Sequence, residues 1–229
     1  MKSYAFIFAR GGSKGLPGKN IKKLGDKPLL AWSIDCALMT GLFERVIVST
    51  DSPEIAEAAR AYGAEVPFMR PAELASDSSA EWLAWRHALD NLPPFDLFVS
   101  LPATAPLRSP ETVRRCVDMY LEGGSDLILT VSRAHRHPSF NMVFLDDRGN
   151  ADLILPPTGK AIMRRQDVRP AYDVSTVCYV TAPSFIRSHF GPFSGHTRAV
   201  VIEAEEAVDI DTQLDFTLAE LILSTREHK

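Results

Sequence analysis

The sequence predicts an α/β protein with a doubly wound, mostly parallel sheet. Three short apolar runs, 4–9, 45–50 and 96–101, read as buried strands. Between them lie stretches with apolar residues at helical spacing, and strands that alternate with helices of about ten or more residues form parallel sheets. Ligands of such sheets bind at the carboxyl ends of the strands. Functional residues are therefore expected just after strands.

Local signals support each element in chain order. Pro28 suits the first turn of a helix over 28–40, and Gly41 suits its end. The expected strands are 4–9, 45–50, 64–68, 96–101, 126–131, 174–181 and 199–202. The expected helices are 28–40, 54–62, 79–92, 110–121, 183–189 and an amphipathic last helix over 212–226.

Composition fits one globular domain. The chain has 229 residues, of which 45% are hydrophobic, so a full core is available and we expect a single domain over 1–229. A net charge of −4 argues against nucleic acid or an anionic membrane as a partner. No run approaches the roughly 18 apolar residues of a membrane span, and Met1 leads directly into a strand, so we expect a cytoplasmic protein.

Two residue types have ordinary structural interpretations. Cys36, Cys116 and Cys178 are far apart in apolar settings, and we expect buried, reduced thiols. Trp82 and Trp85 share a helix face that is expected in the core rather than as a stacking platform for bases.

The alternation of strands and helices stops between 132 and about 170. This segment is rich in Arg, His, Pro and Asp, with weak strands near 142–145 and 151–155. It is too long for a plain loop in a compact domain. We expect an insertion, assigned to 132–172, that packs on something else.

The stretch from Ala5 to Asn20 reads as a strand that enters a phosphate-binding loop. Four glycines there permit positive φ and a close approach of the backbone to an anion, and three cations accompany them. The glycines are Gly11, Gly12, Gly15 and Gly18, and the cations are Arg10, Lys14 and Lys19. Ser13 and Asn20 break the Walker A pattern, and the G-x-G-x-x-G fingerprint is absent. A polyphosphate is the expected ligand, and a turn with solvated lysines is the alternative.

The segment Val208-Asp209-Ile210-Asp211-Thr212 precedes the last helix. If it is extended, Asp209 and Asp211 point the same way and offer two oxygen ligands to Mg²⁺. The alternative is helix capping, by Thr212 with Asp215 in a capping box or by Asp211 itself. Helix capping would explain only one of the two carboxylates of Asp209 and Asp211, whereas metal binding explains both.

Further polar segments follow other strands. Arg70 begins the octet 70–77, which is interpreted either as a turn with a local salt bridge or as a ligand contact. Two prolines fix the backbone of 100–108. Arg164 and Arg165 suit a carboxylate ligand, because guanidinium binds carboxylate in a bidentate way, or they form a solvated basic turn.

The loop resembles the signature A-R-x-x-S-K-G-[LI]-x-x-K-N of the acylneuraminate cytidylyltransferases, or CMP-sialic acid synthetases, a family that includes related nonulosonic acid enzymes. The octet 70–77 and the segment 209–212 match the same family. Pro102 and Ala105 depart from it where relatives carry glutamine and serine, and Ser175 and Thr176 replace Asn-Gly. The resemblance implies a Rossmann-like nucleotidyltransferase whose inserted arm reaches across a homodimer and completes the partner's sugar site.

The resemblance also implies the role of each residue. Catalytic residues would be Arg10, Lys19 and Asp211. Nucleotide-binding residues would be Arg10, Gly11, Gly12, Ser13, Lys14, Lys19, Asn20, Arg70, Ser79 and Ala80. Sugar-binding residues would be Thr104, Arg165, Gln166 and Tyr179, and Asp209 with Asp211 would bind Mg²⁺.

The implied reaction transfers CMP from CTP to the anomeric hydroxyl of a sialic-acid-like 2-keto sugar acid and releases pyrophosphate, a step of cell-surface polysaccharide biosynthesis. One alternative is a nucleotidyltransferase for a Kdo-like eight-carbon acid or another sugar. Another is a nucleotide-binding regulator that has lost turnover; Arg10, Lys19, Asp209 and Asp211 argue against it.

Overall fold

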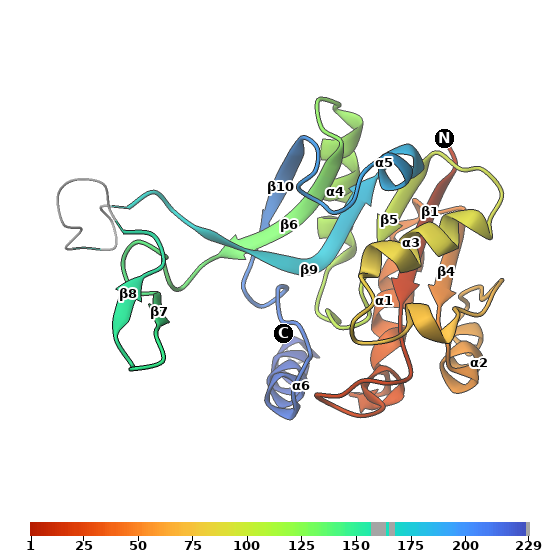
Figure 1. Ribbon diagram of the computed structural model, residues 1–229. Coiled ribbons are helices and arrows are strands. Elements are labelled where there is room, and N and C mark those ends of the chain that lie inside the picture. The colour runs from red at the N-terminus through yellow and green to blue at the C-terminus, as the bar shows by residue number, and fades with distance from the viewer. Residues whose placement is uncertain (157–163, 165–167, 228–229) are drawn as a thin grey trace.

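A six-stranded sheet forms the centre of the protein. The computed structural model describes residues 1–156, 164 and 168–227, and in it the strand order is β10-β6-β9-β5-β1-β4. The strands are β1 (Ser3–Phe8), β4 (Arg45–Ser49), β5 (Leu97–Ser100), β6 (Leu127–Arg133), β9 (Tyr172–Thr181) and β10 (Thr197–Ile202). β9 runs antiparallel to β5 and β6, whereas β1 pairs in parallel with β4 and β5, and β10 in parallel with β6. The predicted mostly parallel sheet is confirmed (Figure 1).

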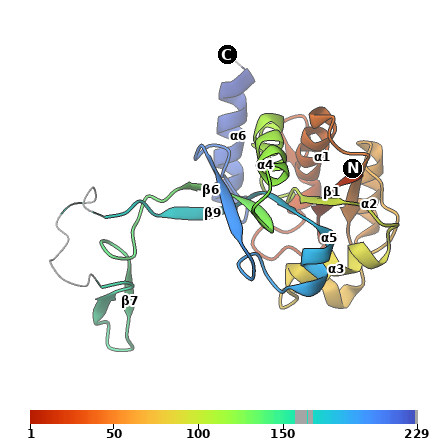
Figure 2. The same cartoon turned by 90° about the horizontal axis from the view of Figure 1, so that it is seen from above.

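Helices cover both faces of this sheet (Figure 2). On one face lie α1 (Leu29–Thr40), α2 (Pro53–Ala61) and α4 (Pro110–Leu121), and on the other lie α3 (Glu81–Asp90) and α5 (Pro183–Ser188). Side chains of β1 alternate between the two cores: Ala5 and Ile7 pack on the first face, and Tyr4 and Phe6 on the second. The fold is therefore doubly wound, as predicted.

Local signals fix the helix ends. Gly41 ends α1 with a φ of 67°, as its position predicts. Ser52 and Ser109 each accept a hydrogen bond from the backbone N–H of the third residue that follows, and a proline occupies the first turn of α2 and of α4. These caps start both helices immediately after the turns that follow strands.

The predicted strand over 64–68 is wrong. Within the described structure, the segment 64–68 pairs with the sheet only through an isolated parallel bridge between Ile47 and Glu65. The Glu65 N–H donates to the Val46 carbonyl, and the Val48 N–H donates to Glu65. Pro67 cannot donate to a ladder, and the chain then turns so that the Arg70 N–H meets the Thr50 carbonyl at 2.8 Å. This turn brings the octet that begins at Arg70 to the carboxyl end of β4.

The segment from 132 to 172 contains a small hairpin that projects from the body (Figures 1 and 2). Its strands are β7 (Val143–Leu145) and β8 (Ala151–Leu153), paired antiparallel outside the main sheet. The end of β6 and the start of β9 lead to it. An insertion was expected here, and both weak strands were predicted.

A third apolar cluster joins the two ends of the chain. Leu16 of the N-terminal loop packs with Ile210 and with Phe216 and Leu223 of α6 (Gln213–Glu227). Short elements follow the same loop: η1 (Lys19–Ile21), β2 (Lys23–Leu24) and β3 (Lys27–Pro28). This cluster positions the residues just before α6 beside the glycine-rich loop.

Two further expectations concern buried side chains. Cys36, Cys116 and Cys178 are buried free thiols, as predicted. Trp82 and Trp85 lie in the second core with Leu89, which confirms their packing role. Within the described residues, none of the helices combines the length and the apolar character that crossing a membrane would need.

Candidate active site

The glycine-rich loop begins where β1 ends. The Ala9 N–H donates to the Ser49 carbonyl, which continues the pairing with β4 for one more residue. Asn20 is buried, and its side-chain amide donates to the Arg10 carbonyl at 2.9 Å. The end of the loop is thereby tied to its start, and the predicted nucleotide-binding Asn20 acts here on the loop backbone.

The loop glycines serve different purposes. Gly18 has a φ of 67°, and Gly11, Gly12 and Gly15 have no positive φ, so the expected left-handed conformation is found at one of the four. Gly15 instead permits close approach: a Cβ there would lie 2.4 Å from the Asp211 carbonyl oxygen. Any side chain at Gly15 would push the loop away from the segment before α6.

Asp51 orients the start of the loop and was not predicted as a site residue. It follows β4, and its Oδ1 accepts a hydrogen bond from the Gly11 N–H at 3.0 Å. This N–H was expected to face a phosphate, but it is engaged by a carboxylate. The same Oδ1 lies 3.9 Å from the Arg70 guanidinium. The signal that could have identified it is its place directly after a buried strand.

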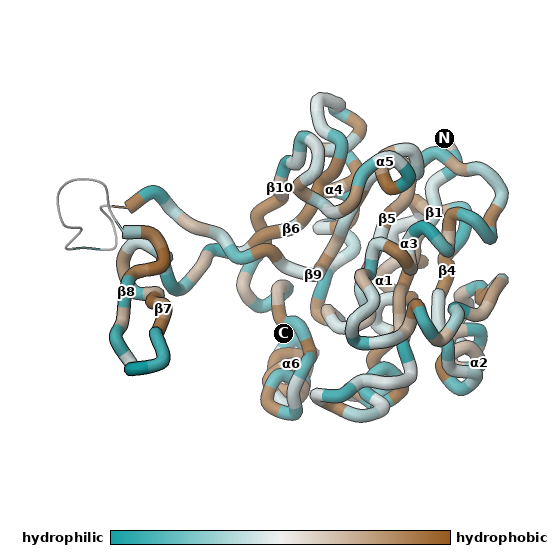
Figure 3. The backbone as a smooth tube through the Cα atoms, in the orientation of Figure 1, coloured by the Kyte–Doolittle hydropathy of each residue, from teal (hydrophilic) through white to brown (hydrophobic). Residues whose placement is uncertain are grey.

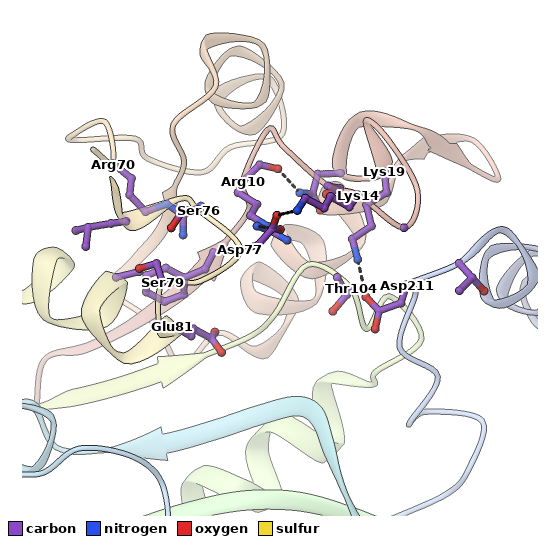
Figure 4. Close-up of a pocket in the computed structure, with 17 residues that line it drawn as sticks. Arg10, Lys14, Lys19, Arg70, Ser76, Asp77, Ser79, Glu81, Thr104 and Asp211 are labelled. Carbon is purple, nitrogen blue, oxygen red and sulfur yellow. Dashed lines mark hydrogen bonds and ion pairs between the residues drawn. The ribbon is translucent and has the colours of Figure 1, made fainter. Parts of the chain in front are cut away.

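The two ends of the chain meet at Lys19. Its ammonium donates to the Ile210 carbonyl at 2.6 Å. It also donates to Asp211 Oδ1 at 2.9 Å (Figure 4). The Lys19 side chain is only 11% exposed, whereas that of Asp211 is 73% exposed. The cationic loop and the C-terminal Asp211 therefore lie side by side.

Helix capping before α6 uses other groups than the two predicted ligands. Asp215 Oδ2 accepts hydrogen bonds from the backbone N–H and the hydroxyl of Thr212, and the Asp215 N–H donates to the Thr212 hydroxyl. Thr212 and Asp215 therefore form the capping box. The alternative in which Asp211 caps the helix is wrong, and neither Asp209 nor Asp211 is consumed by capping.

Asp209 is partly buried with one oxygen unused. Its Oδ1 is buried and makes no hydrogen bond within the described structure. Burial raises the pKa of Asp209, the negative charge of Asp211 raises it further, and the Thr104 and Thr176 hydroxyls lower it. Such an oxygen suits a hard cation, and Mg²⁺ often takes one or two carboxylates and completes its shell with phosphate oxygens and water. Within the described ranges no third Asp, Glu, His or Cys joins the pair.

Arg70 is buried at the base of its octet. Its Nε and Nη2 lack hydrogen-bond partners in the described structure, as does the buried hydroxyl of Ser79. Burial lowers the pKa of Arg70, and the charge of Asp51 opposes this effect. A charged donor without an acceptor is costly inside a protein. These unused donors favour the ligand-contact interpretation of Arg70 over a tight local salt bridge.

Asp77, the last residue of the octet, meets the cations of the loop. Its two carboxylate oxygens lie 2.5 Å from Arg10 Nη1 and 2.5 Å from Lys14 Nζ (Figure 4). The octet and the loop thus face each other across a cleft. Asp77 was not predicted as a site residue, because sequence spacing does not reveal which carboxylate faces which cation.

The cleft between these segments has a volume of about 480 Å³. Nine of the predicted residues line it, namely Arg10, Ser13, Lys14, Lys19, Asn20, Arg70, Ser79, Thr104 and Asp211. Gly11, Gly12, Ala80, Tyr179 and Asp209 do not line it. Arg165 and Gln166, the two other predicted sugar-binding residues, lie outside the described residues.

The floor of the cleft carries Glu81, which was not predicted. Its side chain lies across the cleft from Thr104 and Asp211 (Figure 4), and it accepts a hydrogen bond from the Trp85 indole at 3.3 Å. The surrounding cleft walls desolvate the carboxyl and raise its pKa. Tyr179 packs edge-on against Trp85, and burial together with the charges of Glu81 and Asp209 raises its pKa to about 12. The Tyr179 hydroxyl therefore remains protonated at neutral pH.

These contacts define a class of protein. A cationic loop follows β1, unused donors follow the turn after β4, and Asp211 precedes the last helix, all around one cleft. Ligand sites of doubly wound sheets lie at the carboxyl ends of strands in this way. The arrangement is that of a nucleotide-binding α/β protein able to grip a phosphate chain from two sides.

Comparisons with known proteins identify the family. Residues 4–224 match the family model described as cytidylyltransferase, and the chain belongs to this family. It is 34% identical to the post-translational flagellin modification protein B of Campylobacter coli, over 96% of this chain and 94% of that protein. It is 33% identical to the CMP-N,N'-diacetyllegionaminic acid synthase of Legionella pneumophila, over 99% of this chain and 98% of that protein.

A solved structure supports the fold. The chain resembles CMP:2-keto-3-deoxy-manno-octonic acid synthetase complexed with CTP, with a TM-score of 0.76 and 17% identity over 99% of this chain and 100% of the other. At this identity the likeness concerns the fold, which is that of the Rossmann-like nucleotidyltransferases.

Proposed function

We propose that this protein transfers CMP from CTP to the anomeric hydroxyl of a nine-carbon 2-keto sugar acid and releases pyrophosphate. The observation that carries the proposal is the contact of Lys19 with Asp211, which brings the cationic loop and one of the two C-terminal carboxylates to one cleft. The sugar class follows from the relatives, one of which is named for a CMP-legionaminic acid product. The N-acylneuraminates named in the sequence resemblance belong to the same class.

In this proposal each wall of the cleft has a distinct task. Arg10, Lys14 and Lys19 neutralise the phosphates and the charge that develops on the leaving pyrophosphate. Arg70 and Ser79, whose donors lack partners, contact the nucleoside. The sugar approaches from the side of Thr104. Its anomeric hydroxyl releases its proton to water as the oxygen bonds to the α-phosphorus, and the bond from that phosphorus to pyrophosphate breaks in line. Positioning and charge carry such a reaction, with little covalent help from the protein.

We further propose that Asp209 and Asp211 hold Mg²⁺. The supporting observations are the buried unpaired Oδ1 of Asp209 and the exposed carboxylate of Asp211 beside the cleft. The cation would supply positive charge to the phosphate oxygens when bound. Lys19 supplies a further positive partner for Asp211.

The projecting hairpin supports a homodimer as part of the proposal. Phe144 and Leu145 of β7 are 64% and 68% exposed, and Val143 beside them is also exposed. Figure 3 shows hydrophobic residues on this hairpin, away from the main core. Exposed apolar residues of this kind favour a protein partner, and a second copy of the chain would use them. Analytical sedimentation of the wild type and of the double variant Phe144→Glu, Leu145→Glu tests this proposal. We expect the wild type to sediment as a dimer and the double variant as a monomer.

The activity test is pyrophosphate release. The protein is incubated with CTP, Mg²⁺ and one acceptor at a time from N-acetylneuraminic acid, N,N'-diacetyllegionaminic acid and Kdo, with ATP, GTP and UTP as nucleotide controls. We expect release with CTP and a nine-carbon acid, and slower release with Kdo. Release with Kdo alone would contradict the assigned sugar class. CTP binding without release from any acceptor would favour the regulatory alternative.

Because CTP is a cytoplasmic nucleotide, we propose that the protein acts in the cytoplasm.

A further inference from the structure

The cations of the glycine-rich loop are neutralised by a carboxylate of the chain itself. Asp77 bridges Arg10 and Lys14 at 2.5 Å each, and these are two of the three cations expected to hold the phosphates. A carboxylate between two cationic side chains resembles a phosphate group. The carboxylate is planar and the phosphate is tetrahedral, but both have anionic oxygens that accept charged hydrogen bonds. The contact therefore engages two of the cations that the proposed function assigns to the phosphates.

We propose that Asp77 is a specificity-determining residue that competes with the phosphate chain for Arg10 and Lys14, so that only ligands able to displace it bind there. The inference rests on the proposed function, because it takes a nucleoside triphosphate and pyrophosphate as the ligands of this cleft. Ligands whose phosphates do not reach these two cations escape the competition.

The contact is charged but open to solvent. Hydrogen bonds from Lys14 and Arg10 lower the pKa of Asp77, so the group stays anionic at neutral pH. The Asp77 side chain is 39% exposed and that of Lys14 is 81% exposed. Exposed ion pairs contribute little to stability. A polyphosphate with several charges can displace Asp77 from such an exposed contact, whereas a buried salt bridge would be harder to displace.

The segment around Asp77 is suited to a local shift. Ser76 bonds within the segment, to the Glu73 carbonyl and the Ser78 hydroxyl, and the Ser79 N–H donates to the Ser76 carbonyl. The segment lies between η2 (Ala72–Leu74) and α3, outside both apolar cores. Asp77 can therefore leave the cations without disturbing the packing of the domain.

The competition has a consequence for both binding and release. The triphosphate must displace Asp77 when it enters, and after the reaction the returning carboxylate competes with the pyrophosphate that remains on Arg10 and Lys14. A monophosphate held by its base and ribose does not meet this competitor. Asp77 thus weakens pyrophosphate and CTP binding selectively and speeds product release.

The test compares Asp77→Asn with Glu73→Gln, which removes the same charge from the exposed neighbouring turn. Titration calorimetry with CTP, inorganic pyrophosphate and CMP is performed on the full chain. We expect Asp77→Asn to bind CTP and pyrophosphate about three- to tenfold more tightly, in keeping with the loss of two exposed ion pairs, with CMP affinity unchanged and Glu73→Gln like the wild type. Pyrophosphate inhibition of turnover should tighten to the same extent.

Three results would overturn the inference: unchanged or weaker pyrophosphate binding by Asp77→Asn, equal tightening for CMP, or equal tightening by Glu73→Gln. Asp77→Ser serves as a second variant, and thermal melting checks that both fold. If the wild type binds neither CTP nor pyrophosphate, the proposed function fails. If it binds them and Asp77→Asn does not differ, only the role of Asp77 fails.

Discussion

The Lys19 ammonium lies 2.9 Å from Asp211 Oδ1, although the two residues are separated by 192 positions in the sequence. Lys19 also donates to the carbonyl of Ile210, whose buried side chain packs with Leu16 of the loop. Polar and apolar contacts thus hold the same two segments together. Substitutions on either side should affect the same cleft.

Lys19→Ala should lower CTP affinity by at least about tenfold, because a charged hydrogen bond contributes roughly 1.5–3 kcal/mol. The variant loses both the phosphate contact and the tether to Ile210. Calorimetric titration with CTP measures the effect, and thermal melting checks the fold. Wild-type CTP affinity in a folded variant would show that Lys19 does not hold the triphosphate.

Asp211→Ala should reduce turnover at least about a hundredfold, the scale expected when one electrostatic contact of a transition state is lost. Its side chain is exposed beside the cleft and takes no part in capping, so the fold should survive. Pyrophosphate release and thermal melting are measured beside Asp118→Ala, an exposed carboxylate of α4. A near-normal rate in Asp211→Ala would refute its role as a metal ligand.

Gly15→Ala should destabilise the protein by about 1–3 kcal/mol, as overpacking does, and should weaken CTP binding. The added Cβ would lie 2.4 Å from the Asp211 carbonyl oxygen, which is backbone and cannot rotate away. Gly12→Ala is the matched control for stability, since nothing described lies within 4 Å of a Cβ there. Urea unfolding measures both, and equal stability of the two variants would contradict the close approach.

Asp215 should make stability depend on pH below its unfolded pKa. Hydrogen bonds from Thr212 lower its pKa in the folded state from the ordinary 3.8. A lowered folded pKa means that the unfolded state binds the proton more readily, so this stabilisation is present above pH 3.8 and is lost as pH falls through the folded value. Asp215→Asn should therefore lose stability at pH 7 and show a flatter acid limb in urea unfolding at several pH values. A pH profile that keeps its wild-type slope would exclude this contribution.

Much of the fold followed from the sequence because buried strands and crossover helices have strong local signatures. The prediction of a strand over 64–68 was wrong because apolar residues alone do not form a hydrogen-bonded ladder. Pro67 and the turn to Arg70 limit the pairing to one bridge at Glu65. The reversed direction of β9 also has no local signature, since direction depends on how the chain returns from the projecting hairpin.

The site followed from the sequence only in part. Lys19 and Asp211 were predicted because a glycine-rich loop with cations and a pair of carboxylates can each be recognised from a few consecutive residues. Asp51, Asp77 and Glu81 were missed, because each acts through a partner on another segment: Gly11, Arg10 with Lys14, and Trp85. Such pairings depend on which strand ends are neighbours in the sheet.

We propose that a triphosphate lies between the glycine-rich loop and a divalent cation held by Asp209 and Asp211. The most direct test is a crystal structure with CTP and Mn²⁺ in place of Mg²⁺, with the metal located by anomalous scattering. We predict a Mn²⁺ peak within about 2.5 Å of a carboxylate oxygen of Asp209 or Asp211, with the triphosphate in contact with Arg10 and Lys19. Mn²⁺ and phosphates on another face of the molecule, or a triphosphate that touches only one of the two segments, would contradict the claim.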